Sequence, residues 1–475
     1  ELAQYMRTAA EGDTVRLGGD IDIDLTTPGE MTGFLGENGH LFLDGSDPTA
    51  PAHSQTLDLA GHTLTVRTGS EQCCFALKGG ITLTVIDSSA GKTGRIVGAS
   101  NGSLFVGEAD TGLVLDGVAL AYTDFDGEGD PAPVLATDGQ LTVKDVDYTP
   151  AEGGAPLVDT TVYGAETESA DGVTKYHTTV DAAVEAAAEG DTVRLLADNL
   201  YRASALTVDK SITLDLGAYD MHAISGRVII VSGTENVTIT AEPQTITDPP
   251  REASVRSTLG IDVTESKNVT IENISVSATS TLQPGISVTA STDVVFRNVS
   301  VTSGCTGIFA TDGSSVTVDG SAVTTAGNFA AVRAENVSSV GVTNKSAVTS
   351  PYIGVWVRPG CTGTITDSAV TANGGAACYY AVYANGGSAE ISGSTLTSDY
   401  IGLEVNEGGS ASVTGSTITL ANIDSNPKYA PIGIGIGTGQ GMEVTVTDCT
   451  IDAAAVNGSN TGVGIQVYGA YTDKE

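Results

Sequence analysis

The sequence predicts an all-β protein built as a solenoid, a parallel β-helix whose short strands repeat along nearly the whole chain. Two observations carry this prediction: an opening segment occurs twice, and a shorter apolar pattern with a fixed turn residue follows each copy. The 475 residues are 40% hydrophobic and only 17% charged, which indicates a folded core rather than a disordered chain.

The segment that opens the chain is repeated near its middle. Ala-Ala-Glu-Gly-Asp-Thr-Val-Arg-Leu at residues 9–17 recurs unchanged at 187–195, and apolar residues at helical spacing precede both copies. Each copy has a glycine where the C-terminal end of a helix favours one, and strand periodicity follows. We therefore expect short helices at 1–11 and 178–189, each of which caps the open end of one stack of rungs.

A shorter pattern then takes over, in which a Gly, Asn or Asp stands two positions after one apolar residue and three positions before another. These three residue types tolerate positive φ best, so the pattern suits a one-residue corner between two strands. Most neighbouring copies lie roughly 22 to 33 residues apart within each stack, with a partial copy at Val85 and Asp87. The corner residues are Gly61, Gly117, Asp145, Asn273, Asn298, Gly320, Asp367, Gly393, Gly415 and Asp448.

A second strand accompanies each corner, and its period-two alternation turns Ile and Val inward and the residue between them outward. The pattern gives about four rungs in the first part of the chain and about ten in the second. We expect a first capped stack at 1–150, a polar linker at 151–176, and a second capped stack at 177–475 that continues in a longer natural polypeptide.

The chain resembles the right-handed parallel β-helix, or pectate-lyase-like, superfamily, and more narrowly the large repeat-bearing surface proteins of bacteria. The resemblance rests on the duplicated opening motif, on Thr-Leu-Asp-Leu-Ala-Gly-His-Thr-Leu at 56–64, and on Asn-Val-Thr-Ile at 236–239 and 268–271. It implies a right-handed helix over nearly the whole chain and an extracellular location at a bacterial cell surface. Because this fold carries lyases, hydrolases, tailspikes and adhesins, it implies no single function.

The net charge excludes several classes of partner. The chain has 58 Asp and Glu against 21 Lys and Arg, a formal net charge of −37. No basic patch is left to neutralise phosphates, which argues against nucleic acid and acidic membrane surfaces. No apolar run approaches the roughly 18 residues that span a bilayer, so we expect no membrane insertion of this segment.

The outward residues of the second strand form a candidate binding strip. They include the only tryptophan, between an arginine and a tyrosine of the neighbouring rungs. Such a row suits a sugar, whose apolar face lies on a ring while its hydroxyls bond to polar neighbours. The interpretation in which the rings form a plain ladder that stabilises the sheet stays open. The strip consists of Phe309, Arg333, Glu335, Trp356, Arg358, Tyr383, Asn385, Glu404 and Asn406.

Catalysis is favoured less than binding. The superfamily's enzymes use clustered carboxylates, sometimes with calcium, but the galacturonidase-type signatures Asn-Thr-Asp, Asp-Asp and Gly-His-Gly are absent, and none of the five His lies beyond residue 222. Glu335 and Glu404 lie three rungs apart on the predicted register, about 14 Å, which exceeds the carboxylate separation of glycoside hydrolases. The sequence therefore assigns no catalytic residue.

One acidic loop is a candidate calcium site. Asp124, Asp126, Glu128 and Asp130 place carboxylates at alternate positions, although Leu135 stands where a calcium loop has its bidentate Glu. A solvated acidic loop is the competing interpretation. We expect no required cofactor, with calcium as an optional ligand.

Three functions fit these features. The leading one is a non-enzymatic extracellular segment of a bacterial surface protein, a rigid acidic rod with an adhesin-like strip that binds a glycan or a cell-surface protein of a host or neighbour. The alternatives are a polysaccharide lyase or glycoside hydrolase that acts on the outer face of the second stack, and a structural spacer or filament subunit that associates with its own copies.

Overall fold

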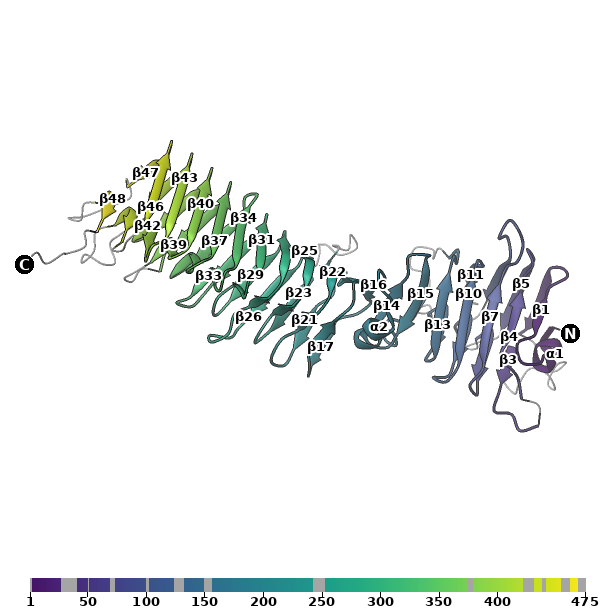
Figure 1. The fold of residues 1–475 in the computed structure, drawn as a ribbon. Coiled ribbons are helices and arrows are strands. Elements are labelled where there is room, and N and C mark those ends of the chain that lie inside the picture. Colours follow the sequence, from purple (N-terminus) through teal and green to yellow (C-terminus); the bar gives the residue numbers. More distant parts are fainter. Residues whose placement is uncertain are drawn as a thin grey trace, which may run out of the picture. The chain divides into compact units, whose positions relative to one another are not determined.

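The computed structural model describes residues 2–26, 41–49, 51–68, 73–99, 102–123, 132–148, 156–241, 253–374, 379–421, 431–437, 441–453 and 462–468. The chain divides into two compact units. The first unit comprises Glu1–Ala187 and Asp191–Ala197, and the second comprises Ala188–Gly190 and Asp198–Glu475. In each unit, short strands follow one another as stacked rungs (Figure 1).

The first unit begins with α1 (Leu2–Thr8), which buries Leu2 and Met6 in the hydrophobic core. Three parallel sheets follow, and each rung supplies one strand to each sheet. The first sheet contains β1 (Thr14–Arg16), β4 (Gln55–Asp58), β7 (Thr82–Ile86), β10 (Gly112–Asp116) and β13 (Gln140–Lys144). The second contains β2 (Ile21–Leu25), β5 (Thr63–Thr68), β8 (Arg95–Ala99) and β11 (Ala119–Thr123). The third contains β3 (Leu41–Asp44), β6 (Phe75–Lys78), β9 (Phe105–Gly107) and β12 (Leu135–Thr137).

After β13 the chain leaves the parallel pattern. Two strands form an antiparallel hairpin, one of which pairs with β13 and the other with a strand that follows α2. The strand that follows α2 carries Arg194, and its partner in the hairpin carries Glu166. An ion pair of 2.9 Å between these two side chains joins the two strands. Part of the expected linker 151–176 is thus paired β-structure, and the helix expected to cap the second stack belongs to the first unit. The elements are β14 (Ala165–Glu168), β15 (Val173–His177), α2 (Val180–Ala186) and β16 (Thr192–Leu195).

The second unit is a longer stack of the same kind, with three parallel sheets that the chain visits in turn. Sheet 1 contains β17 (Asn199–Arg202), β20 (Met221–Ala223), β23 (Ser254–Ser257), β26 (Ser275–Ala278), β29 (Ser300–Ser303), β32 (Ala322–Thr325), β35 (Ala347–Ser350), β38 (Ala369–Ala372), β41 (Thr395–Ser398), β44 (Thr417–Leu420) and β47 (Thr450–Asp452). Sheet 2 contains β18 (Leu206–Val208), β21 (Ile229–Ser232), β24 (Ile261–Thr264), β27 (Ile286–Thr289), β30 (Ile308–Thr311), β33 (Ala330–Ala334), β36 (Ile353–Val357), β39 (Tyr380–Asn385), β42 (Ile401–Asn406), β45 (Ile432–Ile436) and β48 (Val463–Val467). Sheet 3 contains β19 (Thr213–Asp215), β22 (Glu235–Thr240), β25 (Lys267–Glu272), β28 (Thr292–Arg297), β31 (Ser315–Asp319), β34 (Ser339–Thr343), β37 (Thr362–Thr366), β40 (Ser388–Ser392), β43 (Ser410–Thr414) and β46 (Glu443–Thr447).

The predicted corners and alternation are confirmed. Every corner residue named from the sequence has a positive φ, between 48° and 86°. On β36, Val355 and Val357 are fully buried while Trp356 between them is partly exposed. Period-two side-chain alternation and one-residue corners therefore produce the all-β parallel solenoid that the sequence predicts.

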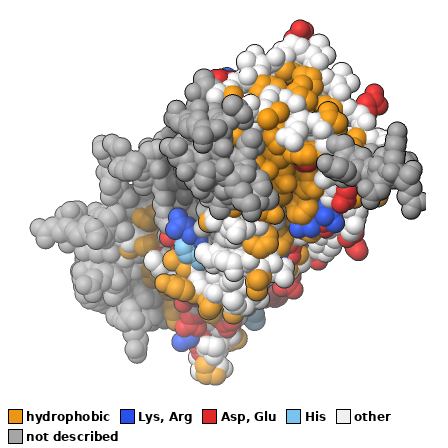
Figure 2. Space-filling view, turned by 90° about the vertical axis from the view of Figure 1, so that its left-hand side faces the viewer, with side chains coloured by type: hydrophobic (Ala, Val, Ile, Leu, Met, Phe, Trp, Pro, Cys, Tyr) orange, Lys and Arg blue, Asp and Glu red, His pale blue; other side chains and the backbone are white. Residues whose placement is uncertain are grey.

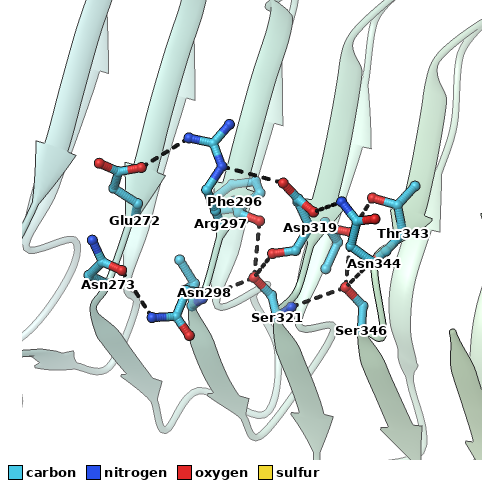
Figure 3. Close-up of polar contacts among 12 residues, drawn as sticks. Glu272, Asn273, Phe296, Arg297, Asn298, Asp319, Ser321, Thr343, Asn344 and Ser346 are labelled. Atoms are coloured by element: carbon cyan, nitrogen blue, oxygen red, sulfur yellow. Dashed lines mark hydrogen bonds and ion pairs between the residues drawn. The ribbon is translucent and has the colours of Figure 1, made fainter. Parts of the chain in front are cut away.

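Buried serines stack along the corners between sheets 3 and 1 of the second unit. Ser321 donates its backbone N–H to Oγ of Ser346 at 3.0 Å (Figure 3). The hydroxyl groups of both serines donate to backbone carbonyl oxygens. That of Ser321 donates to Phe296 at 3.0 Å, and that of Ser346 donates to Thr343 at 2.6 Å. The corner backbone, which cannot complete a sheet ladder, is thereby satisfied without water. The same link recurs at these corners for Ser368 and Ser394 and for Ser394 and Ser416. A second row of buried serines forms this link at the corners between sheets 2 and 3, for Ser266 and Ser291, Ser291 and Ser314, and Ser314 and Ser338.

Polar side chains also join neighbouring rungs on the outside of these corners. Asn298 donates from Nδ2 to Oδ1 of Asn273 at 2.9 Å, and Arg297 pairs with Glu272 at 3.1 Å and with Asp319 at 3.3 Å (Figure 3). Because these pairs are largely exposed, they contribute less to stability than the buried serines do.

The last described rung exposes apolar side chains. Val446, Ile465 and Val467 are 37%, 52% and 68% exposed, since no described rung covers them. Hydrophobic side chains gather on this face, which lies at the left of Figure 1 and is turned to the viewer in Figure 2. The stacked core is therefore open to solvent at this end of the described chain.

Removal of one ladder hydroxyl is expected to destabilise the second unit. Ser346→Ala leaves the buried N–H of Ser321 without its acceptor, at a cost of about 1–3 kcal/mol. The measurement is the midpoint of urea unfolding, followed by circular dichroism. Thr302→Ala, at an exposed position of β29, is the control and should change the free energy of unfolding by less than about 0.5 kcal/mol. Equal midpoints for the two variants would contradict the role of the ladder.

Candidate functional site

The outward residues of sheet 2 form one line across consecutive rungs, with the register that the sequence predicts. Arg333 pairs with Phe309 on one side and with Trp356 on the other, and Trp356 pairs with Tyr383. Tyr383 in turn pairs with Glu404. The structure therefore brings these five side chains together on one face, although they are up to 95 positions apart in the sequence.

The other four predicted strip residues lie two positions further along their strands. Asn385 pairs with Asn406 on the neighbouring rung. Arg358 directly follows β36, and Glu335 directly follows β33. Arg358 donates its backbone N–H to the carbonyl oxygen of Ala334 on the neighbouring rung. The strip is therefore two residues wide.

Trp356 is the centre of a stack of planar groups. The guanidinium carbons of Arg333 and Arg358 lie 4.6 and 5.1 Å from the centroid of its ring, and the Tyr383 ring lies 5.9 Å away at an angle of 25°. Arg333 also lies 5.4 Å from the Phe309 ring. From the sequence we expected a sugar to lie flat on an aromatic ring of the strip. On Trp356 it can do so only if it displaces these neighbours. Trp356 is partly exposed, while its Nε1 atom is buried.

Glu335 ties the two arginines together. Its Oε1 atom lies 3.2 Å from Nε of Arg358 and is in contact with Nη2 of Arg333. All three side chains are between 20% and 36% exposed. The shared carboxylate offsets one of the two positive charges beside Trp356.

Five polar atoms of the strip are buried without a hydrogen-bond partner among the described residues. One of them, Nε of Arg358, lies 3.2 Å from Oε1 of Glu335 in an ion pair, which leaves four atoms unpaired. Two of the four are donors, Nε of Arg333 and Nε1 of Trp356. The other two are acceptors, Oδ1 of Asn385 and Oε2 of Glu404. Buried polar atoms in folded proteins nearly always have partners. A group of them on four consecutive rungs indicates a place where a ligand or ordered water completes the hydrogen bonds.

Glu404 has the most unusual environment of the strip. Its side chain is 5% exposed, and burial raises its pKa to about 7, with no opposing effect from any cation of the described residues. Tyr383 and Tyr468 lie near enough that the Glu404 charge helps to raise their pKa, that of Tyr468 to about 12, although burial is the larger cause for both. Tyr468 follows β48, and sequence reasoning missed it because it lies outside the repeated strand pattern.

Two glycines on the next rung make room for the strip side chains. A Cβ atom on Gly435 would collide with Oε2 of Glu404 and would lie 3.6 Å from Cε2 of Tyr468. A Cβ atom on Gly437 would lie 2.5 Å from the side chain of Asn406. Glu404 and Asn406 therefore lean over β45. The alternating glycines of Ile-Gly-Ile-Gly-Ile were the sequence signal for this space.

The candidate calcium residues Asp124, Asp126, Glu128 and Asp130 lie outside the described residues. In the described ranges, no group of three or more His, Cys, Asp or Glu is arranged to hold a metal ion. Of the helices in the same ranges, none is long and apolar enough to cross a membrane.

Comparison with known proteins identifies the fold. Residues 220–380 match the family described as the right handed beta helix region. This span contains most of the strip, from Phe309 to the first residue of β39. No curated protein matches the chain.

Several solved structures are similar to parts of the chain. The enzymatically active domain of tailspike protein 2 from bacteriophage CBA120 is 15% identical over 66% of this chain and 49% of its own, with a TM-score of 0.42. ORF18 of Geobacillus virus E2 is 10% identical over 68% and 72%, with a TM-score of 0.34. The Dettilon tailspike protein is 10% identical over 87% and 62%, with a TM-score of 0.30. The chain spans about half the length of the first of these proteins. Likeness at this level carries no information about activity or ligand.

The environment of Glu404 makes stability depend on pH. Because its pKa is about 7 in the folded chain and near 4.5 when solvated, Glu404 favours folding most below pH 4.5, and this contribution is lost as the pH rises to 7. We therefore compare the free energy of unfolding of Glu404→Gln with that of the wild type at two pH values. The difference in favour of the variant should be roughly 2–3 kcal/mol larger at pH 8 than at pH 4.5. Thermal unfolding at the two pH values measures it. Glu390→Gln, on exposed β40, is the control, and the same pH profile for both variants would refute the prediction.

Proposed function

We propose that this chain, a right-handed parallel β-helix protein, is an extracellular segment of a bacterial surface protein that binds a glycan along the strip on sheet 2 and does not cleave it. The stacked rungs supply a rigid support, since every strand of the strip is hydrogen-bonded to both neighbours. The formal charge of −37 keeps such a long β-structure soluble.

The observation that carries the proposal is the group of four buried, unpaired polar atoms along the strip. A plain stacking ladder needs none of them, because ring stacking stabilises a sheet without hydrogen bonds. Sugars present both donors and acceptors on every hydroxyl group and can satisfy Nε1 of Trp356 and Oδ1 of Asn385 alike. The glycan would lie along the edges of the stacked side chains, across several rungs.

A second candidate function, polysaccharide cleavage, is favoured by one observation. A carboxyl group with a pKa of about 7, as at Glu404, suits a general acid at neutral pH. Its counterpart on the strip, Glu335, is bound to two arginines and lies three rungs away, about 14 Å by strand spacing. That distance is longer than the roughly 5–9.5 Å between the carboxylates of glycoside hydrolases. Binding without cleavage is therefore the better supported function.

The proposal is tested by Trp356→Phe, which keeps a ring in the stack and removes the unpaired Nε1–H donor. On a glycan array of bacterial and host glycans, the wild type should bind a defined set, and the variant should bind it about 5–10 times more weakly, the effect of one lost hydrogen bond. Tyr201→Phe, on an exposed side chain of β17, is the matched control and should bind like the wild type.

Two outcomes would contradict the proposal. New reducing ends released from a bound glycan by the wild type, and lost in Glu404→Gln, would establish the enzyme instead. Equal retention of every glycan by wild type and Trp356→Phe, or no retention by either, would leave the spacer function.

A further inference from the structure

Glu404 stands apart from the rest of the strip because its carboxyl group has no charged partner among the described residues. Its side chain is 95% buried, and neither an ion pair nor a hydrogen bond to Oε2 is formed within the described part of the chain. The other strip carboxylate, Glu335, has two arginines. A buried carboxylate without a partner is costly, so the site gains most from a ligand that brings a positive charge.

The surroundings of Glu404 favour an organic cation over a metal ion. Calcium takes about six to eight oxygen ligands, whereas the unpaired buried acceptors here are Oε2 of Glu404 and, on the neighbouring strand, Oδ1 of Asn385. The Tyr468 ring lies beside the carboxylate over Gly435. Tyr383, the register neighbour of Glu404, stacks its ring on Trp356 and Tyr380, so Tyr468 is the ring that we assign to a cation. An aromatic ring beside a carboxylate stabilises an ammonium ion through its negative face.

The geometry points to an ammonium-binding subsite formed by Glu404 and Tyr468, next to Tyr383, at one end of the strip. We propose, on the basis of the glycan-binding function above, that the glycan carries an amino sugar whose nitrogen is not acetylated, and that this ammonium group pairs with Oε2 of Glu404. Asn385 accepts a second hydrogen bond through Oδ1. The hydroxyl groups of the following sugars then reach Trp356 and Arg333, two and three rungs away.

The charge of the protein supports this assignment. A net charge of −37 raises the local concentration of cationic polymers at the surface and speeds their binding. The arginines at the other end of the strip oppose a cation only weakly, because they share Glu335 and lie at least two rungs from Glu404. An N-acetylated sugar would place a neutral amide against the carboxylate and would leave its charge unpaired.

The subsite is tested with two matched probes, the hexamer of β-1,4-linked glucosamine and the corresponding hexamer of N-acetylglucosamine, by calorimetry at pH 7. The wild type should bind the glucosamine hexamer at least about tenfold more tightly. Glu404→Gln should remove this preference, whereas the control Glu390→Gln should keep it. Equal affinities of the wild type for the two hexamers would overturn the inference. The proposed glycan binding would survive that result if Trp356→Phe still weakened both.

A second probe decides the case in which neither hexamer binds. Tetramethylammonium keeps its charge at every pH. Of the ligand and the Glu404 carboxyl group, only the carboxyl group titrates, so the affinity follows the ionisation of Glu404. Between pH 6 and pH 8 the affinity measured by NMR titration should rise about tenfold, as the carboxyl group passes through a pKa of about 7. Glu404→Gln should abolish the binding. No binding by the wild type at pH 8, or binding that Glu404→Gln leaves unchanged, would overturn the ammonium subsite.

Discussion

Hydrogen bonding between successive rungs is the constraint on which the rest of this structure depends. Each rung can bury its Val and Ile side chains only if the next one lies directly over it in register, since a slip of one residue would turn every apolar side chain outward. The buried serines fix that register at the corners, where Ser321 and Ser346 join rungs through backbone N–H and hydroxyl oxygen. The register of one rung therefore cannot shift unless the registers of its neighbours shift with it.

The same register creates the strip. Stacked rungs place residues that are more than 20 positions apart in sequence in direct line, so Arg333, Trp356 and Tyr383 become one surface. Their planar groups pack against one another through the ring faces, while several polar atoms of the strip stay without a hydrogen-bond partner among the described residues. In the function that we propose, the stacked ladder and the ligand site are two aspects of this one arrangement.

Several features could be read from the sequence because they depend on local chemistry. Corner residues such as Asn298 and Gly320 were predictable because few residue types adopt positive φ, and the line of outward side chains followed from the period of two. The hairpin at β14 and β15 could not be predicted, because its strands are polar and its pairing with β16 depends on partners distant in sequence. Tyr468 was missed for a related reason, since it approaches Glu404 from outside the repeat.

The sequence by itself determined the fold class, the corners and the order of the strip residues, because each follows from conformational preference and periodicity. Only the tertiary structure decided how those side chains use their surfaces. It placed guanidinium groups and a phenol ring against Trp356 and paired both strip arginines with Glu335. It also buried Glu404 with no described residue as the partner of its Oε2 atom. Burial and pairing are properties of neighbours in space, and a raised pKa such as that of Glu404 exists only once those neighbours have excluded water.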